Sequence, residues 1–148
     1  MSTAPELDVE IRTSEGVPAI DIARLEALLS SAALAERRSG EVGVWLCSDD
    51  EIADLHLRFM DIPGPTDVIS FPGDPPYLGD IAVSFDTAAS QALDAEHSVA
   101  REIAYLVLHG LLHLFGYDDL TQPERDAMLS RQDKLIEAFE KANAGAWD

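Results

Sequence analysis

The run HGLLHLFGYDD contains two histidines and an aspartate, His109, His113 and Asp119, at a spacing that could hold a metal ion. Residues four apart on a helix project from one face, so the two imidazoles would lie one above the other. Neutral imidazoles so placed can bind one zinc ion at about 2.0–2.1 Å per bond. Gly116 can adopt the left-handed conformation that ends a helix, and the turn could bring Asp119 to the same ion. The run therefore predicts a His-His-Asp site with a fourth position open for water.

Two other interpretations of this run must be weighed. A bare HxxxH pattern on an apolar helix is often only a pair of partly buried histidines. The added glycine and carboxylate favour a metal, and the spacing is that of the metzincin peptidases. However, Gly110 follows the first histidine, where zincins carry the glutamate that acts as general base. Peptidase chemistry is therefore disfavoured.

The composition indicates one domain in a reducing compartment. A chain of 148 residues with 47% hydrophobic residues can bury one core. It has no run of 18 apolar residues that would predict a membrane span. The acidic start, residues 1–16, lacks the apolar segment of a signal peptide. A lone Cys47 excludes an intramolecular disulfide, so a cytoplasmic protein is expected.

The charge restricts how the chain could act on RNA. It has 28 acidic and 10 basic residues, with a formal net charge of −18. An acidic surface repels nucleic acid over long range. Any function on RNA must therefore use a local positive site, a metal or a protein partner.

Hydrophobic periodicity predicts the order β-α-β-α-β-β-α-α-α. The expected strands span residues 6–13, 41–47, 67–71 and 80–85, and the expected helices span 20–37, 49–60, 86–96, 98–115 and 124–143. Ser48 and Glu51 form a capping-box pattern at the second helix. We predict an α+β domain with one mixed sheet of about four strands packed with helices. The helix over 98–115 is apolar nearly all round and should be buried, with the metal site at its end.

Several segments together resemble one family. HGLLHLFGYDD is similar to the HGxLHLxGYDH signature of the YbeY endoribonucleases, bacterial factors for rRNA maturation. PTDVISFP (65–72) resembles the family's PTDVLSFP, and LGDIAVS (78–84) resembles its LGDIxIS. The segments over 97–110 and 124–132 are also similar. The resemblance covers about residues 41–140 and implies one YbeY-like metallohydrolase domain over 1–148.

The chain departs from the family pattern at the third ligand. The family usually has histidine there, and this chain has Asp119. A carboxylate can serve, since catalytic zinc sites with two histidines and a carboxylate exist. The anionic ligand lowers the net charge at the metal and should weaken catalysis. Two histidines and a carboxylate also suit iron(II), so we expect zinc with iron(II) or another divalent metal as the alternative.

A second departure concerns phosphate contact. His56 stands where the family usually has asparagine, and Met60 where it often has arginine. Arg58 is the only arginine nearby. By the resemblance it would neutralise the phosphate through its guanidinium fork, and otherwise it would form a surface ion pair with Asp54 or Asp61.

The resemblance implies a metal-dependent, single-strand-specific endoribonuclease for 16S rRNA 3′-end maturation and ribosome quality control. Its partners would be single-stranded rRNA and the small ribosomal subunit or its proteins. Asp118 is a candidate catalytic residue, which would orient a ligand histidine or else cap the helix. The sequence leaves four candidates for the general base, namely hydroxide on the metal, Asp118, Asp67 and the RNA 2′-hydroxyl.

Two alternatives belong to other classes. One is a metallohydrolase acting on another substrate such as peptide, which Gly110 disfavours. The other is a non-catalytic ribosome-assembly factor with a structural metal. A structural zinc has four protein ligands, and the sequence offers three, since Cys47 is expected inside a core strand.

Overall fold

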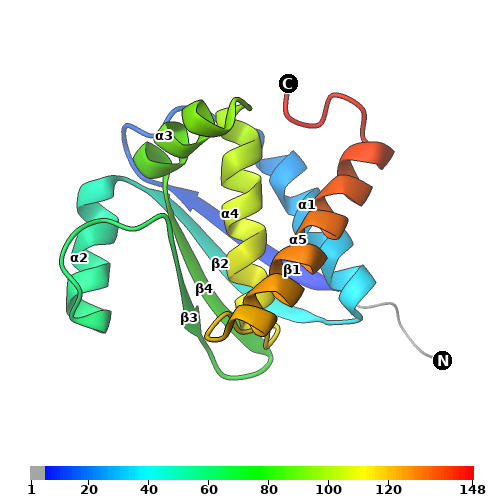
Figure 1. Cartoon of the computed structure of the whole chain (residues 1–148), viewed down its shortest axis with the longest axis horizontal. Helices are drawn as coiled ribbons and strands as arrows, with labels where there is room; N and C mark the ends of the chain where they lie inside the picture. The colour runs from blue at the N-terminus through cyan, green and yellow to red at the C-terminus, as the bar shows by residue number, and fades with distance from the viewer. Residues whose placement is uncertain (1–5) are drawn as a thin grey trace.

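A computed structural model describes residues 6–148, so the first five residues of the acidic N-terminal stretch lie outside the described part. The described chain forms four strands and five helices in the predicted order (Figure 1). The strands are β1 (Leu7–Thr13), β2 (Gly40–Cys47), β3 (Val68–Pro72) and β4 (Tyr77–Ser84). The helices are α1 (Ile22–Glu36), α2 (Asp49–Met60), α3 (Phe85–Ala95), α4 (Val99–Leu114) and α5 (Gln122–Ala142).

The four strands form one mixed sheet in the order β1-β2-β4-β3, which confirms the predicted α+β class. β1 pairs with β2 and β2 with β4 in parallel, whereas β3 pairs with β4 antiparallel. Parallel neighbours require a crossover, and α1 provides the one between β1 and β2. β3 and β4 are joined by a short loop, as antiparallel neighbours allow.

The two faces of the sheet carry different hydrophobic clusters. On β2, Val42, Val44 and Leu46 face the main core, whereas Cys47 belongs to a smaller cluster with Ile52 of α2. This alternation follows from the period of two along a strand. α2 therefore covers the face of the sheet opposite to the other helices, and it stands apart from them at the left of Figure 1.

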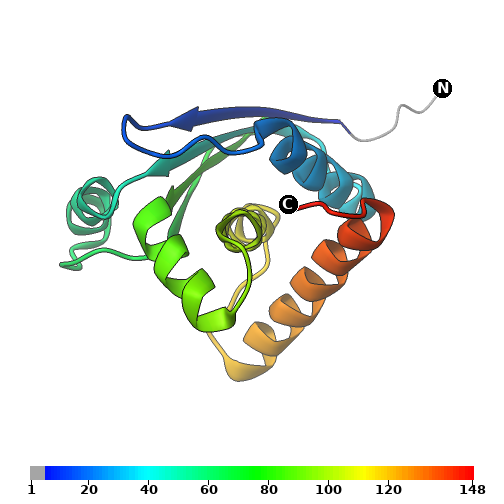
Figure 2. The same cartoon turned by 90° about the horizontal axis from the view of Figure 1, so that it is seen from above.

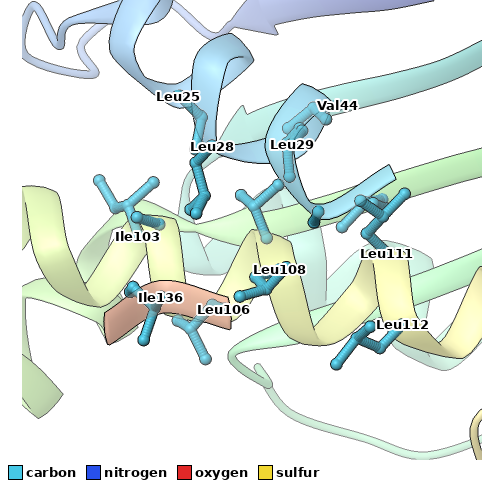
Figure 3. Packing of buried hydrophobic residues seen from close by; sticks show 14 of the residues in the cluster. Leu25, Leu28, Leu29, Val44, Ile103, Leu106, Leu108, Leu111, Leu112 and Ile136 are labelled. Carbon is cyan, nitrogen blue, oxygen red and sulfur yellow. The ribbon is translucent and has the colours of Figure 1, made fainter. Parts of the chain in front are cut away.

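α4 is the central helix, as its apolar sequence predicts. Figure 2 shows it end-on, with α1, α3, α5 and the sheet around it. In Figure 3, Leu25, Leu28 and Leu29 of α1 lie on one side of α4 and Ile136 of α5 lies near Leu106. Each fully buried leucine contributes about 1.5–3 kcal/mol to folding. Within residues 6–148, no helix combines the length and the apolar character that crossing a bilayer requires.

Side-chain caps fix where the helices begin. The Ser48 hydroxyl accepts from the Glu51 amide at 3.2 Å, and the Glu51 carboxylate accepts from the Ser48 amide at 2.9 Å, which confirms the capping box. The Ser98 hydroxyl caps α4 by accepting from the Arg101 amide at 3.1 Å. The chain direction into α2 and α4 is thus set by local sequence.

Gly110 lets α4 lie directly on the sheet. A Cβ atom at this position would lie 2.6 Å from Cγ2 of Ile81 and 3.1 Å from Oγ of Ser70. The Ser70 hydroxyl donates to the Gly110 carbonyl at 3.1 Å. A glutamate here would meet β3 and β4, so the packing itself excludes the general base of a zincin.

We expect Gly110→Ala to lower the free energy of unfolding despite the better helix propensity of alanine. Overpacking against Ile81 costs about 1–3 kcal/mol, which exceeds the propensity gain of about 1 kcal/mol. Denaturant unfolding of Gly110→Ala, Ile81→Ala and the double variant measures this. In the Ile81→Ala background the cost should shrink, because the clashing side chain is gone. Strictly additive effects would contradict the clash.

Candidate metal centre

Three donor side chains converge at the end of α4. Donor atoms of His109, His113 and Asp119 all lie within 4.8 Å of one another. The Asp119 Oδ2 atom is 3.5 Å from Nε2 of His109 and 3.4 Å from Nε2 of His113. Their side chains are 17%, 27% and 30% exposed, so the donor set is partly buried yet open to solvent.

A glycine turn after α4 brings the aspartate back to the histidines. Gly116 has a φ of +106°, and its amide donates to the His113 carbonyl at 3.0 Å. This conformation favours glycine and closes the helix end. The Tyr117 hydroxyl donates to the Glu36 carboxylate at 2.6 Å, which fixes the turn to α1 and raises the pKa of Tyr117. The turn predicted at Gly116 is therefore present and well anchored.

Hydrogen bonds fix both imidazole rings. The Gln132 side chain donates through Nε2 to the Tyr105 carbonyl at 3.1 Å, so its Oε1 faces His109 Nδ1 at 2.7 Å as an acceptor. His113 Nδ1 lies 3.0 Å from the Tyr117 carbonyl, which can only accept. Acceptors therefore face both Nδ1 atoms, and the two Nε2 atoms are directed toward Asp119 as candidate ligands.

The distances between donors fit an ion held among them. Two ligand atoms bonded to zinc at about 2.1 Å with tetrahedral angles lie about 3.4 Å apart. The two Nε2–Oδ2 distances are 3.5 and 3.4 Å. A direct charge-assisted hydrogen bond would be shorter, about 2.7–2.9 Å. Two nitrogens and one oxygen suit zinc or iron(II).

The number of donors favours a catalytic over a structural ion. Within residues 6–148 the group holds three candidate ligands, and Cys47 is buried in β2 outside it. A structural zinc is closed by four protein ligands, whereas a catalytic zinc keeps three and an open position. This arrangement leaves a position for substrate or water.

The donor set opens into a cavity of about 740 Å³. Such a volume lies within the range of roughly 300–1,000 Å³ that ligand sites occupy. Its walls come from the end of α2, from β3 and its preceding loop, and from α4 and α5. Four carboxylates line it, those of Asp67, Glu102, Asp118 and Asp119. The cavity can hold part of an extended polar ligand next to the ion site.

The family profile described as endoribonuclease YbeY matches residues 11–140. The chain belongs to the YbeY family. Proteins named endoribonuclease YbeY from Mycobacterium tuberculosis and Thermobifida fusca are each 37% identical to it, which confirms the resemblance read from the sequence. The first alignment covers 90% of this chain and 84% of the relative, and the second covers 92% and 96%.

A solved structure also supports this assignment. The solution structure of TM1509 from Thermotoga maritima has a TM-score of 0.69 to this chain and 29% sequence identity. The match covers 90% of both chains. The fold of the YbeY-family chain is therefore shared with a known structure over nearly its whole length.

The two predicted catalytic residues of this YbeY-family chain lie in different places. Arg58 is not among the residues that line the cavity, and its NH1 lies 2.9 Å from Oδ2 of Asp54 in an exposed ion pair. This pair is the other role that the sequence left open. Asp118 lines the cavity. The ring Nδ1 atoms are bonded by Gln132 and a backbone carbonyl, so Asp118 does not orient a ligand histidine.

The candidate base Asp67 is already engaged. Its carboxylate accepts from the Val68 amide at 2.8 Å and from Nε2 of Gln91 at 3.2 Å. These bonds fix the start of β3 beside the cavity. Of the two carboxylates that are candidate general bases, Asp67 and Asp118, Asp118 is the more accessible, because its side chain is exposed.

Sequence reasoning missed three residues of the site. Gln132 supports His109, Glu102 is buried in the cavity wall with Oε1 at 2.6 Å from Nε2 of His97, and Arg125 lines the cavity from α5. A helical signal was present, since Arg125 and Gln132 are seven residues apart and share a face of one helix. Only the packing of α5 on α4 reveals what that face meets.

Proposed function

We propose that this protein is a metal-dependent endoribonuclease that cleaves single-stranded RNA in 16S rRNA 3′-end maturation and ribosome quality control. Residues 1–148 would act as one metallohydrolase domain. Membership of the YbeY family, whose relatives are named endoribonucleases, supports hydrolysis of RNA. The single observation that carries the proposal is the set of three donors at ion-binding distances beside a cavity.

The proposed ion is zinc, with iron(II) or another divalent metal as the alternative because of Asp119. His109, His113 and Asp119 would hold it. When bound, such an ion polarises a phosphodiester oxygen or activates water for hydrolysis. The acceptors beside both Nδ1 atoms orient the two rings so that their Nε2 atoms face the proposed ion.

The chain's own groups would bind and orient the RNA in the cavity. Asp118 presents an exposed carboxylate there and is our candidate for accepting or relaying a proton. Arg58 lies outside the cavity, so it could contact only a more distant phosphate of the strand, and only after leaving Asp54. That exchange is inexpensive, because exposed ion pairs contribute only about 0.2–1 kcal/mol.

The charge suggests how the enzyme meets its substrate. A net charge of −18 repels free RNA and attracts basic protein surfaces. The proposed partners are therefore the small ribosomal subunit or its proteins, which would deliver single-stranded rRNA to the cavity. The proposed location is the cytoplasm.

The proposal is tested by cleavage of a single-stranded RNA that carries the 3′-end precursor of 16S rRNA. We expect cleavage by the wild-type protein with Zn²⁺, loss of cleavage with chelator, and no cleavage by His113→Ala purified in parallel. The variant guards against a contaminating ribonuclease. Equal cleavage by both proteins would contradict the proposal, as would inactivity of the zinc-loaded wild type with and without small subunits.

A further inference from the structure

Arg125 is the cation of the metal cavity. Among the described residues that line the cavity, it is the only lysine or arginine. Four carboxylates line the same cavity, and the whole chain has 28 acidic and 10 basic residues. A polyanion that enters the cavity would therefore be attracted electrostatically by the bound ion and by the guanidinium of Arg125.

The Arg125 guanidinium is available for a ligand. Within residues 6–148, Arg58, Arg101 and Arg131 form ion pairs with acidic side chains. Arg125 forms none, as is also true of Arg12, Arg24, Arg37 and Arg38, but Arg125 alone among these five lines the cavity. Arg125 is exposed, and its backbone amide, rather than its side chain, donates to the Thr121 carbonyl at 2.9 Å. The feature that distinguishes Arg125 is therefore its place: an exposed guanidinium without an acidic partner lies at the wall of the cavity that contains the three donors.

The position of Arg125 relative to the ion site is set by α5. Arg125, Leu129 and Gln132 all line the cavity and follow helical spacing along one face. Gln132 contacts the ligand His109. Seven residues of helix span about 10 Å, so Arg125 lies about two helical turns from Gln132. A strand whose phosphate sits at the ion would pass Arg125 with a neighbouring part of its backbone.

We propose that Arg125 binds a backbone phosphate of the RNA strand next to the phosphate that is cleaved, and so positions the strand in the cavity. The inference rests on the proposed function. A guanidinium fork matches two phosphate oxygens and stays charged at all physiological pH. It would supply the local positive site that the acidic chain needs, and it acts in binding rather than in bond cleavage.

The test compares wild type, Arg125→Ala, Arg125→Lys and Lys134→Ala. Lys134 is exposed on α5, nine residues further on and so on the opposite face, and its loss changes the net charge equally. Binding of a fluorescent single-stranded RNA is measured by anisotropy, with chelator present to prevent cleavage, at several salt concentrations. Cleavage with Zn²⁺ is measured in parallel.

We expect Arg125→Ala to weaken RNA binding about five- to tenfold at low salt. The slope of log affinity against log salt should fall by about 0.7, because one phosphate contact is lost. Arg125→Lys should restore the slope and part of the affinity, and Lys134→Ala should change neither. KM for cleavage should rise in Arg125→Ala with kcat nearly unchanged.

The outcomes separate this inference from the proposed function. Arg125-dependent binding without cleavage by the zinc-loaded wild type would support the contact between Arg125 and an RNA phosphate and reject the nuclease. Wild-type affinity and slope in Arg125→Ala would overturn the inference while cleavage still tests the nuclease. An equal effect of Lys134→Ala would also overturn it, since overall charge would then explain both, and so would a wild type that binds no RNA.

Discussion

Asp119→Ala should raise the dissociation constant for Zn²⁺ by more than about 100-fold and abolish RNA cleavage. Asp119 supplies the one oxygen and the one negative charge of the donor set, so the variant leaves two imidazoles. Loss of a group that only supports a ligand already costs about 10–100-fold in affinity, and loss of a ligand should cost more. Competition with a chromogenic chelator measures the affinity of the purified variants.

The neighbouring Asp118→Ala is the matched control for zinc affinity. It removes the same charge from the same cavity, yet Asp118 is not part of the donor set. Its zinc affinity should stay within about threefold of wild type, because an exposed charge acts only through a screened field. An equal loss in both variants would place the ion elsewhere. Asp119→His should keep zinc and disfavour iron(II), since three imidazoles replace the two-histidine, one-carboxylate set.

The grouping of the three candidate metal ligands was predictable because everything that places them is local. His109 and His113 need only a helix, and Asp119 needs only the turn that Gly116 makes after it. The same holds for α2, whose start follows from the side chains of Ser48 and Glu51. Both features lie within short segments, of which the longer, His109 to Asp119, has eleven residues. Sequence patterns could therefore predict them.

The fold was predictable for a related reason. Alternation on β2 and the continuous apolar surface of α4 each determine what must be buried. Hydrophobic periodicity could not predict how closely a helix packs against a strand. The contact between Gly110 and Ile81 depends on the stacking of α4 on β4, and only the structure explains why glycine stands there.

Arg58 was chosen as the phosphate contact because it is close to His56 and Met60 along the chain. The structure places it on another face of α2. His56 and Met60 are four residues apart on α2 and both line the cavity. Arg58 lies midway between them in sequence and therefore points to the opposite side of the helix, where Asp54 pairs with it. Helical phase alone could have shown that these three side chains cannot share a cavity.

Gln132 could not be assigned from sequence, because its partner lies 23 residues away on another helix. Its role follows from the way α5 crosses α4 and from a buried amide that must satisfy its donor and its acceptor. The amide meets both demands by bonding Tyr105 and His109. A buried glutamine on an otherwise apolar helix face signals such a partner but does not identify it.

Gln132→Leu should weaken zinc binding about 10–100-fold and lower RNA cleavage at limiting zinc accordingly. The side chain is 0% exposed, so leucine can fill much of its volume. The substitution leaves Nδ1 of His109 without its partner, and it removes one of the bonds to the Tyr105 carbonyl, which stays within the hydrogen bonding of α4. A buried polar group left unbonded costs about 1–3 kcal/mol, so the melting temperature of the zinc-free protein should fall as well.

Three comparisons separate the hydrogen bond of Gln132 from its packing. Met128→Leu changes another fully buried side chain of α5 with similar volume and no polar partner, and it should leave zinc affinity near wild type. Gln132→Glu keeps an acceptor for His109 and should bind zinc better than Gln132→Leu. Excess Zn²⁺ should restore cleavage in Gln132→Leu but not in Asp119→Ala, because the first variant retains all three ligands. Full zinc affinity in Gln132→Leu would show that the ring of His109 is held by packing alone.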